Sequence, residues 1–362
     1  MSRWPDLRLL DLLQIDLPII QAPMAGAMDS RLVIAVAQAG GLGSLPCAML
    51  TPEQVQAEVE TIRRETSRAI NLNFFCHAVP QPDQERQRRW MERLEPFYRE
   101  RGIDPTPPPR RATRMPFDAA ACEVVEHLKP EIVSFHFGLP EPSLLSRVKA
   151  TGAKILSSAT TVDEARWLEQ RGCDAIIAQG YEAGGHRGMF VNDDVATQAG
   201  TMALVPQIVD AVKVPVIASG GIADGRGIAA AFALGAAAVQ IGTAYLFCPE
   251  AKIGAVYAQA LRHAKDNSTV LTNIFSGRPA RGIVNRIVRE VGPLSDLAPQ
   301  FPLAGIAIAP LRASSEAAGS DEFAQLWCGQ VAALSREVPA EELTRQLAAE
   351  ALDRLARLSD QS

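Results

Sequence analysis

The chain has 362 residues, of which 47% are hydrophobic and 21% charged, and its formal net charge is −5. This composition is typical of a globular protein with a large core. The slightly acidic balance provides no basic surface, so a nucleic acid is not expected as a partner.

No uninterrupted apolar run of about 18 residues occurs, so no membrane span is expected. The first residues mix aspartates with leucines, which predicts no signal peptide and a cytoplasmic protein. The six cysteines lie far apart without a CxxC pair, as in a reduced enzyme, and no metal site is predicted.

Short β-prone runs alternate with amphipathic segments along residues 1–265. Strands are predicted at 18–24, 41–47, 69–76, 132–138, 154–160, 174–180, 215–221 and 237–246. Helices are predicted between and after them at 30–40, 51–65, 141–152, 161–172, 201–212, 224–235 and 249–265. Eight such units favour an α/β fold closed as a (β/α)8 TIM barrel. An open doubly wound sheet is the weaker alternative, since no GxGxxG follows the first strand.

Two segments lie outside this alternation of predicted strands and helices. Residues 77–116 combine a charged helix with a proline-rich stretch, which predicts a helical insertion after the third strand, either a solvated helix with a linker or a lid. Residues 266–362 contain a proline-rich connector at 292–310 and predicted helices at 321–335 and 339–358. We expect residues 1–265 to form the barrel and 266–362 to form a C-terminal helical cap packed on it.

Glycine-rich loops follow the seventh and eighth predicted strands, where barrels commonly bind phosphate. Their free backbone amides, together with a helix start near Asp224, suit a phosphate dianion. The alternative is that these glycines only form tight turns. The residues concerned are Ser219, Gly220, Gly221, Gln240, Ile241, Gly242 and Thr243.

Two amides, Asn71 and Gln179, lie near the ends of predicted strands. Each can donate and accept hydrogen bonds, as the pyrimidine edge of a flavin requires. Together with a phosphate site they indicate flavin mononucleotide (FMN), and no dinucleotide fingerprint supports FAD. A barrel that binds a phosphate ligand without flavin is the alternative from another class.

Several motifs resemble those of the nitronate monooxygenase family, formerly called 2-nitropropane dioxygenases. They occur in order over nearly the whole chain, and FHFGLP (135–140) and LWCGQVAAL (326–334) resemble the bacterial class I branch in particular. The others are PIIQAPMAG, NLNFF, QGYEAGGHRG, SGGIADGRG, GAAAVQIGTAYL and TNIFSGRPARGIVNR.

The resemblance implies a TIM barrel with non-covalent FMN that oxidises alkyl nitronates, or nitroalkanes, with O2 to carbonyl compounds and nitrite. It implies a role in detoxification, and a homodimer is one option for its assembly. An NAD(P)H-dependent FMN reductase of quinones or enoyl thioesters is the alternative on the same barrel. The implied FMN contacts are Ala22, Pro23, Met24, Asn71, Gln179, Gly184, Gly185, Ser219, Gly220, Gly221, Gln240, Ile241, Gly242 and Thr243.

Two histidines are candidate catalytic residues, because imidazole exchanges protons near neutral pH. His186 lies among glycines after a strand, and by resemblance it faces the substrate at the flavin. His136, in SFHFG, is the second candidate. His77, His127 and His263 are expected to be structural, as are Arg278 and Arg281. The few tyrosines predict a substrate pocket of low polarity, in which Tyr181 is a candidate lining residue.

Overall fold

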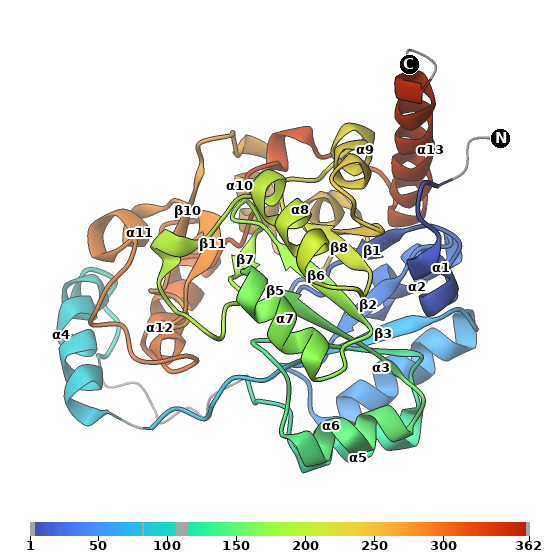
Figure 1. The fold of residues 1–362 in the computed structure, drawn as a ribbon. Coiled ribbons are helices and arrows are strands. Elements are labelled where there is room, and N and C mark those ends of the chain that lie inside the picture. Colours follow the sequence, from blue (N-terminus) through green and yellow to red (C-terminus); the bar gives the residue numbers. More distant parts are fainter. Residues whose placement is uncertain (1–3, 82, 106–113, 360–362) are drawn as a thin grey trace.

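The computed structural model describes residues 4–81, 83–105 and 114–359, whose course is shown in Figure 1. Eight parallel strands form a ring, which confirms the predicted (β/α)8 barrel. Strand β1 pairs with β9, and a parallel bridge from Ile20 to Leu42 links β1 to β2, so the ring closes. The strands are β1 (Ile19–Gln21), β2 (Gly43–Pro46), β3 (Ile70–Phe75), β4 (Ile132–His136), β5 (Lys154–Ala159), β6 (Ala175–Gln179), β8 (Val216–Ser219) and β9 (Ala238–Ile241).

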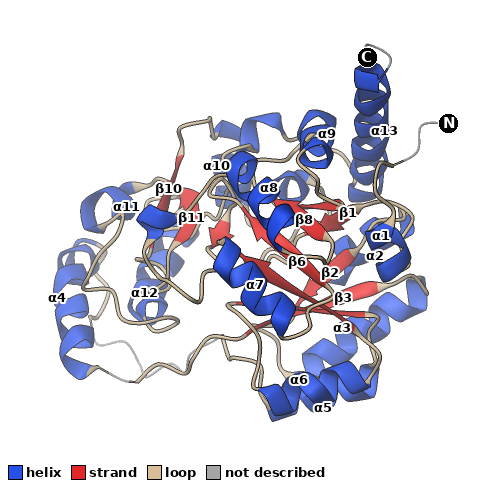
Figure 2. Ribbon diagram, in the orientation of Figure 1, coloured by secondary structure: helices blue, strands red, loops and turns tan. Residues whose placement is uncertain are grey.

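Helices cover the outside of the strands (Figure 2). Local signals set their ends: Thr51 forms a capping box with Gln54 at the start of α3, and Gly40, with φ +97°, follows α2. No helix in the described ranges has the length and apolarity needed to cross a membrane. The helices that follow the first seven barrel strands are α2 (Ser30–Gln38), α3 (Pro52–Glu65), α5 (Ala119–Leu128), α6 (Pro142–Ala150), α7 (Val162–Gln170), α8 (Thr201–Ala211) and α9 (Gly225–Ala233).

The last helix of the chain completes this outer layer. Helix α13 (Ala340–Ser359) packs against both α9 and α2, and its Leu343 and Leu347 are fully buried in the main core. The strand β9 is instead followed by a short 3-10 helix (Thr243–Phe247) and by α10 (Ala255–His263). The helix predicted at 339–358 is therefore present and forms part of the barrel wall.

Side chains inside the barrel change from apolar to polar along the strands. At the N-terminal end, the apolar layer packs against Leu9 and Leu13 of α1 (Arg8–Leu13) and consists of Ile20, Leu42, Ile132, Leu156, Ile177 and Ile217. Side chains two residues apart on a strand share a face. The next inward layer is thus Ala22, Ser44, Ser134, Ser158, Gln179 and Ser219. The polar groups consequently collect at the C-terminal mouth.

A second lobe, residues 84–103 and 266–328, combines the insertion after β3 with the C-terminal extension (Figure 1, left). Its helices are α4 (Gln84–Glu100), α11 (Arg286–Val291) and α12 (Ala304–Ala317). Its antiparallel sheet joins β10 (Thr269–Thr272) to β11 (Ala280–Ile283) and β11 to β7 (Gly185–His186). The sheet therefore reaches back into the loop after β6.

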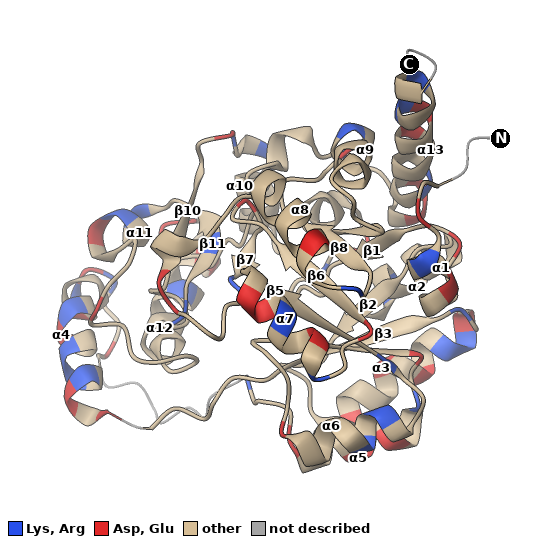
Figure 3. Cartoon of the chain, in the orientation of Figure 1, with Lys and Arg blue, Asp and Glu red and all other residues tan. Residues whose placement is uncertain are grey.

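Helix α4 has one buried face, so it is not simply a solvated helix. Trp90, Leu94, Phe97 and Tyr98 pack into the core of the second lobe, and the Tyr98 hydroxyl donates to the Ala307 carbonyl at 2.5 Å. Acidic and basic residues recur along the helix (Figure 3), and many of them are exposed: Glu85, Arg88, Arg89, Glu92, Arg93, Arg99 and Glu100. The proline-rich residues 106–113 of the predicted insertion lie outside the described residues.

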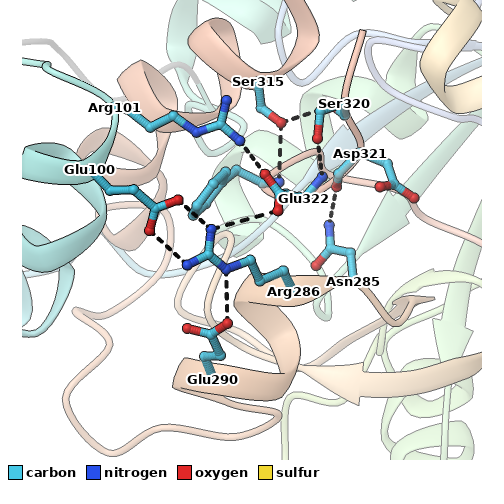
Figure 4. Close-up of polar contacts among 10 residues, drawn as sticks. Glu100, Arg101, Asn285, Arg286, Glu290, Ser315, Ser320, Asp321 and Glu322 are labelled. Atoms are coloured by element: carbon cyan, nitrogen blue, oxygen red, sulfur yellow. Dashed lines mark hydrogen bonds and ion pairs between the residues drawn. The ribbon is translucent and has the colours of Figure 1, made fainter. Parts of the chain in front are cut away.

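Charged side chains tie α4 to the rest of the second lobe (Figure 4). Both Arg286 Nη atoms donate to Glu100, at 2.6 and 2.7 Å, and Arg286 Nε donates to Glu290 at 2.8 Å. Arg101 pairs with Glu322 beside them. The network joins the end of α4, the start of α11 and the turn at 320–322.

The C-terminal extension differs from the sequence prediction at two places. The connector predicted at 292–310 is shorter in the structure, because α12 already begins at Ala304 and continues through Pro310. The apolar face of this helix packs into the core of the second lobe, which stabilises the helix despite the proline. The prediction of a helix at 321–335 is wrong. In the structure, Cys328 N donates to Arg281 O at 3.2 Å, and Ile283 N donates to Leu326 O at 2.8 Å. This segment is extended beside β11, so pairing overrides its helical apolar spacing.

If α13 belongs to the barrel wall, its buried leucines support the whole fold. We expect Leu347→Ala to lower the free energy of unfolding by about 2–5 kcal/mol, because it leaves a cavity in the main core. The matched control is Leu358→Ala on the same helix, at a side chain 60% exposed, with an expected change within about 0.5 kcal/mol. Urea unfolding measures both, and equal effects would contradict this role of α13.

Candidate active site

The ends of β1 and β9 meet at the mouth of the barrel. Ala22 N donates to Ile241 O at 2.8 Å. A Cβ atom built on Gly242 would lie 3.4 Å from Ala22 Cβ and 3.8 Å from Met24 Sδ. The predicted segments 22–24 and 240–243 therefore form one continuous surface, and Gln240 on it is partly exposed.

Asn71 projects into the barrel below this surface. Its Nδ2 donates to Ser44 Oγ at 3.0 Å and to Ser134 Oγ at 2.8 Å. Its Oδ1 is buried and has no hydrogen-bond partner among the described residues. A buried acceptor without a partner is costly, so Asn71 is suited to accept from a bound ligand.

Gln179, at the end of β6, holds the loop that follows it. Its Oε1 accepts from Gly188 N at 2.7 Å, and its Nε2 donates to His186 O at 2.9 Å. These two bonds fix the backbone on both sides of Arg187. The side chain therefore positions the His186 loop in addition to facing the barrel mouth.

Glycines shape a cradle after β8. Gly220 and Gly221 have φ of +108° and +71°, a conformation that favours glycine. A Cβ on Gly220 would lie 3.0 Å from Ala183 N, which leaves little room for a side chain. The N–H groups of Gly221, Thr243 and Ala244 have no acceptor within the part of the chain that the structure describes. Such amides can bind an anion.

The first amides of α9 differ from those of the cradle, because they already have acceptors and are not free for an anion, contrary to what the sequence led us to expect. Asp224 Oδ1 accepts from Arg226 N at 2.9 Å and from Gly227 N at 3.3 Å. Glu350 of α13 accepts from Gly225 N at 3.2 Å. Two carboxylates therefore already cap the helix, and they would repel a dianion there.

The C-terminal extension also reaches the cradle, which the sequence did not indicate. Gly329 N donates to Thr243 Oγ1 at 2.9 Å. A Cβ on Gly184 would lie 2.5 Å from Gly329 N, so Gly184 permits this close approach. Gly329 lies in LWCGQVAAL (326–334), a motif noted above only for its family resemblance, and nothing in that motif placed it beside Thr243.

His186 lies on β7, opposite Ala280 of β11. Its Nε2 lies 2.9 Å from Ser276 Oγ, and the Ser276 hydroxyl also lies within donating distance, 3.2 Å, of the Arg278 carbonyl. If the hydroxyl hydrogen points to that carbonyl, His186 Nε2 carries the hydrogen and Nδ1 keeps its lone pair. His186 Nδ1 makes no hydrogen bond with the described residues.

Aromatic rings surround His186 and form the wall of the site. The ring centroids of Phe301 and Trp327 lie 5.2 and 5.3 Å from that of His186, and those of Phe137 and Phe75 lie 6.1 and 6.3 Å away. These rings come from the barrel and from the second lobe. No sequence pattern pointed to Phe301, because it lies in a proline-rich connector.

The surroundings of His186 favour the neutral imidazole. Burial lowers its pKa well below 6.5, and the charges of Arg114 and Arg278, together with the neighbouring His136, act in the same direction. His186 is therefore uncharged at neutral pH.

His136 is also neutral and is held at both ring nitrogens. Its Nδ1 lies 3.0 Å from Ser158 Oγ and its Nε2 lies 3.2 Å from His186 O. A carbonyl only accepts, so Nε2 carries the hydrogen and Nδ1 accepts from the serine. Burial lowers the pKa of His136 to about 4. This arrangement supports the backbone of His186.

The sequence did not single out Arg187 as a functional residue. It is fully buried, and its guanidinium donates to the carbonyls of Gln179 and Gly180 and to Gln198 Oε1. Its burial lowers its pKa to about 10. Arg187 thus holds the loop through two backbone carbonyls and the Gln198 side chain. These hydrogen-bond partners are spread over residues 179–198, and their spacing matches no sequence motif that would have pointed to Arg187.

The remaining candidates take other places. Arg281 Nε donates to Tyr181 O at 3.0 Å and the guanidinium covers the Tyr181 ring, which agrees with a structural role. His127 and His263 are exposed on α5 and α10. His77 is buried, and its ring centroid lies 4.7 Å from that of Phe301.

Two cavities are not lined by His186. One, of about 210 Å³, lies beside α4, and the other, of about 310 Å³, lies between α9 and α13.

Comparisons with known proteins agree with this arrangement. The family model described as nitronate monooxygenase matches residues 7–350. A nitronate monooxygenase of Pseudomonas aeruginosa is 41% identical over 95% of this chain and 98% of its own, and one of Paraburkholderia phytofirmans is 42% identical over 94% and 93%.

Solved structures show the same relationship. Nitroalkane oxidase from Streptomyces ansochromogenes has a TM-score of 0.88 and 37% identity, covering 97% of this chain and 99% of that one. FabK from Thermotoga maritima has a TM-score of 0.74 and 27% identity, covering 98% and 99%. Because the family model spans nearly the whole chain and the relatives exceed 40% identity, this chain belongs to the nitronate monooxygenase family.

Proposed function

We propose that this protein binds FMN and oxidises alkyl nitronates with O2, releasing nitrite and a carbonyl compound. The observation that carries the proposal is the neutral His186, flanked by the charges of Arg114 and Arg278, inside an aromatic wall beside the glycine cradle. The family is a flavoprotein family, and its named members act on nitronates and nitroalkanes.

The residues at the mouth fit FMN. The unpaired N–H groups of Gly221, Thr243 and Ala244 suit its phosphate, and the unpaired Asn71 Oδ1 suits a donor on its ring. Bound FMN would supply the electron transfer that the protein side chains lack. The residues that would hold it are Ala22, Pro23, Met24, Asn71, Gln179, Gly184, Gly185, Ser219, Gly220, Gly221, Gln240, Ile241, Gly242 and Thr243.

The chain contributes binding and electrostatics. A nitronate is an anion, and the guanidinium groups near His186 create the positive potential that attracts it. The rings of Phe75, Phe137, Phe301 and Trp327 exclude water, which strengthens that attraction. His136 and Gln179 hold the His186 carbonyl and thereby fix the imidazole.

A neutral nitroalkane needs an additional proton transfer. The group placed to accept its α-proton is His186, at Nδ1 if Ser276 holds Nε2. A depressed pKa makes this imidazole a weak base. The site therefore favours substrates that arrive already deprotonated.

Steady-state assays test the proposal. Purified protein should be yellow, consume O2 and release nitrite with a panel of ethyl, propyl and butyl nitronates. Anaerobic mixing with NADH or NADPH should leave the flavin oxidised. Rapid bleaching by either nucleotide without nitrite release would instead support the reductase, and a colourless protein that FMN does not reconstitute would support a phosphate-ligand barrel.

The role of His186 is tested by His186→Asn. We expect turnover of neutral nitroalkanes to fall about 10²–10⁴-fold, because the proton acceptor is lost, while nitronate turnover falls less than about tenfold. His263→Asn, at an exposed histidine of α10, is the control and should match wild type. Full nitroalkane turnover in His186→Asn would rule out His186 as the base.

The cradle is tested by Gly221→Ala, which places a side chain at φ +71° next to the unpaired amides. Gly152→Ala is the matched control, since Gly152 also has positive φ, +91°, and a Cβ there would meet no atom within 4 Å. Both should lose about 1 kcal/mol of stability from backbone strain. Only Gly221→Ala should bind FMN at least about tenfold more weakly, measured by flavin fluorescence quenching.

A further inference from the structure

We propose that Arg278 is a specificity-determining residue, whose guanidinium binds the anionic nitro group of the nitronate beside His186 and thereby selects the deprotonated substrate. This inference rests on the proposed function. It assigns the preference of the site for an anionic substrate to one side chain, Arg278.

The guanidinium lies on the wall of the site. Arg278 Cζ is 4.1 Å from the centroid of the Phe137 ring. That ring lies 4.5 Å from His136, 5.5 Å from Phe301 and 6.1 Å from His186. A cation stacked on this ring faces the same group of residues that surrounds the imidazole.

Most of the hydrogen-bonding capacity of Arg278 is unused. One Nη atom donates to the Met189 carbonyl, but Nε is buried without an acceptor, and the other Nη has none among the described residues. Nor does any carboxylate in the described ranges lie within 4.0 Å of it, whereas Arg147 and Arg336 each pair with a glutamate. A guanidinium fork with free donors matches a planar anion with two oxygens, such as a nitronate.

The backbone of Arg278 is fixed relative to His186. Arg278 N donates to Ser276 Oγ at 3.4 Å, and Ser276 Oγ lies 2.9 Å from His186 Nε2. Two residues later, Ala280 pairs with His186 between β11 and β7. Ser276 Oγ thus contacts both the His186 ring and the Arg278 backbone, which fixes the start of the Arg278 side chain next to the imidazole.

The charge of Arg278 contributes to the selection. Burial is the main cause of the low pKa of His186, and positive charge at Arg114, His136, Arg278 and His77 lowers it further, so a protonated His186 is disfavoured. Deprotonation of a nitroalkane would create an imidazolium beside this guanidinium. A nitronate adds no proton to His186 and is itself attracted by the cation.

The experiment compares Arg278→Gln and Arg278→Lys with wild type in the FMN-loaded enzyme. Arg289→Gln is the matched control, since Arg289 is an exposed arginine on α11 of the same segment. Sodium nitrate, a planar oxyanion, serves as an unreactive probe, and its binding is followed through the NMR signals of the His186 imidazole.

In Arg278→Gln we expect nitrate affinity to fall roughly ten- to hundredfold and the pKa of His186 to rise towards 6.5. The kcat/KM for nitronates should fall by a similar factor, mainly through KM, and the preference for nitronates over nitroalkanes should shrink. Arg278→Lys should lie between Arg278→Gln and wild type, because it keeps the charge and loses the fork. Arg289→Gln should match wild type.

Unchanged nitrate affinity and unchanged nitronate kcat/KM in Arg278→Gln would overturn the inference. If Arg278→Gln does not fold, nitrate affinity equal to wild type in Arg278→Lys would overturn it, because the fork would then be dispensable. If the wild-type enzyme releases no nitrite from any nitronate, the proposed function fails, while nitrate binding still decides whether Arg278 binds planar anions.

Discussion

The pairing of β7 with β11 is the contact on which the site depends. Only Gly185 and His186 form β7, yet their ladder with Ala280 and Arg281 connects a barrel loop to the C-terminal extension. On the barrel side, the same loop is held through backbone atoms by Gln179, His136 and Arg187. Fixing a loop from two sides lets an imidazole keep one orientation on glycine-rich backbone, which alone would be too mobile for precise chemistry.

Electrostatics and packing reinforce each other around this loop. The aromatic wall limits the access of water to His186; this burial is the main cause of its low pKa, and it also strengthens the effect of the nearby guanidinium charges. Leaving arginine donors without carboxylate partners costs free energy. An anion bound there as proposed would offset this cost, and the arginines would thereby contribute to substrate selection.

Sequence reasoning succeeded where local patterns carry the information. The eight strands follow from apolar runs bounded by glycines, and Gln179 at the end of β6 could be found from them. Asn71 is also recognisable as an amide in an apolar run, but it is the second residue of β3 and does not lie near the end of that strand. Sequence reasoning failed where distant segments decide the structure. A two-residue strand such as β7 has no periodicity, and α12 includes Pro310. Residues 321–335 have helical spacing, but residues 326–328 within them pair with β11. Ser276 and Arg187 have partners far along the chain, which no single pattern connects.

The position of α13 has a consequence for how the protein is made. Residues 340–359 pack against both α9 and α2, so the outer layer of the barrel stays open until these residues have been translated. Until then, the apolar surfaces that later contact Leu343 and Leu347 remain uncovered. The nascent chain is exposed to aggregation during this interval, and any truncation before residue 340 yields a barrel with an uncovered seam.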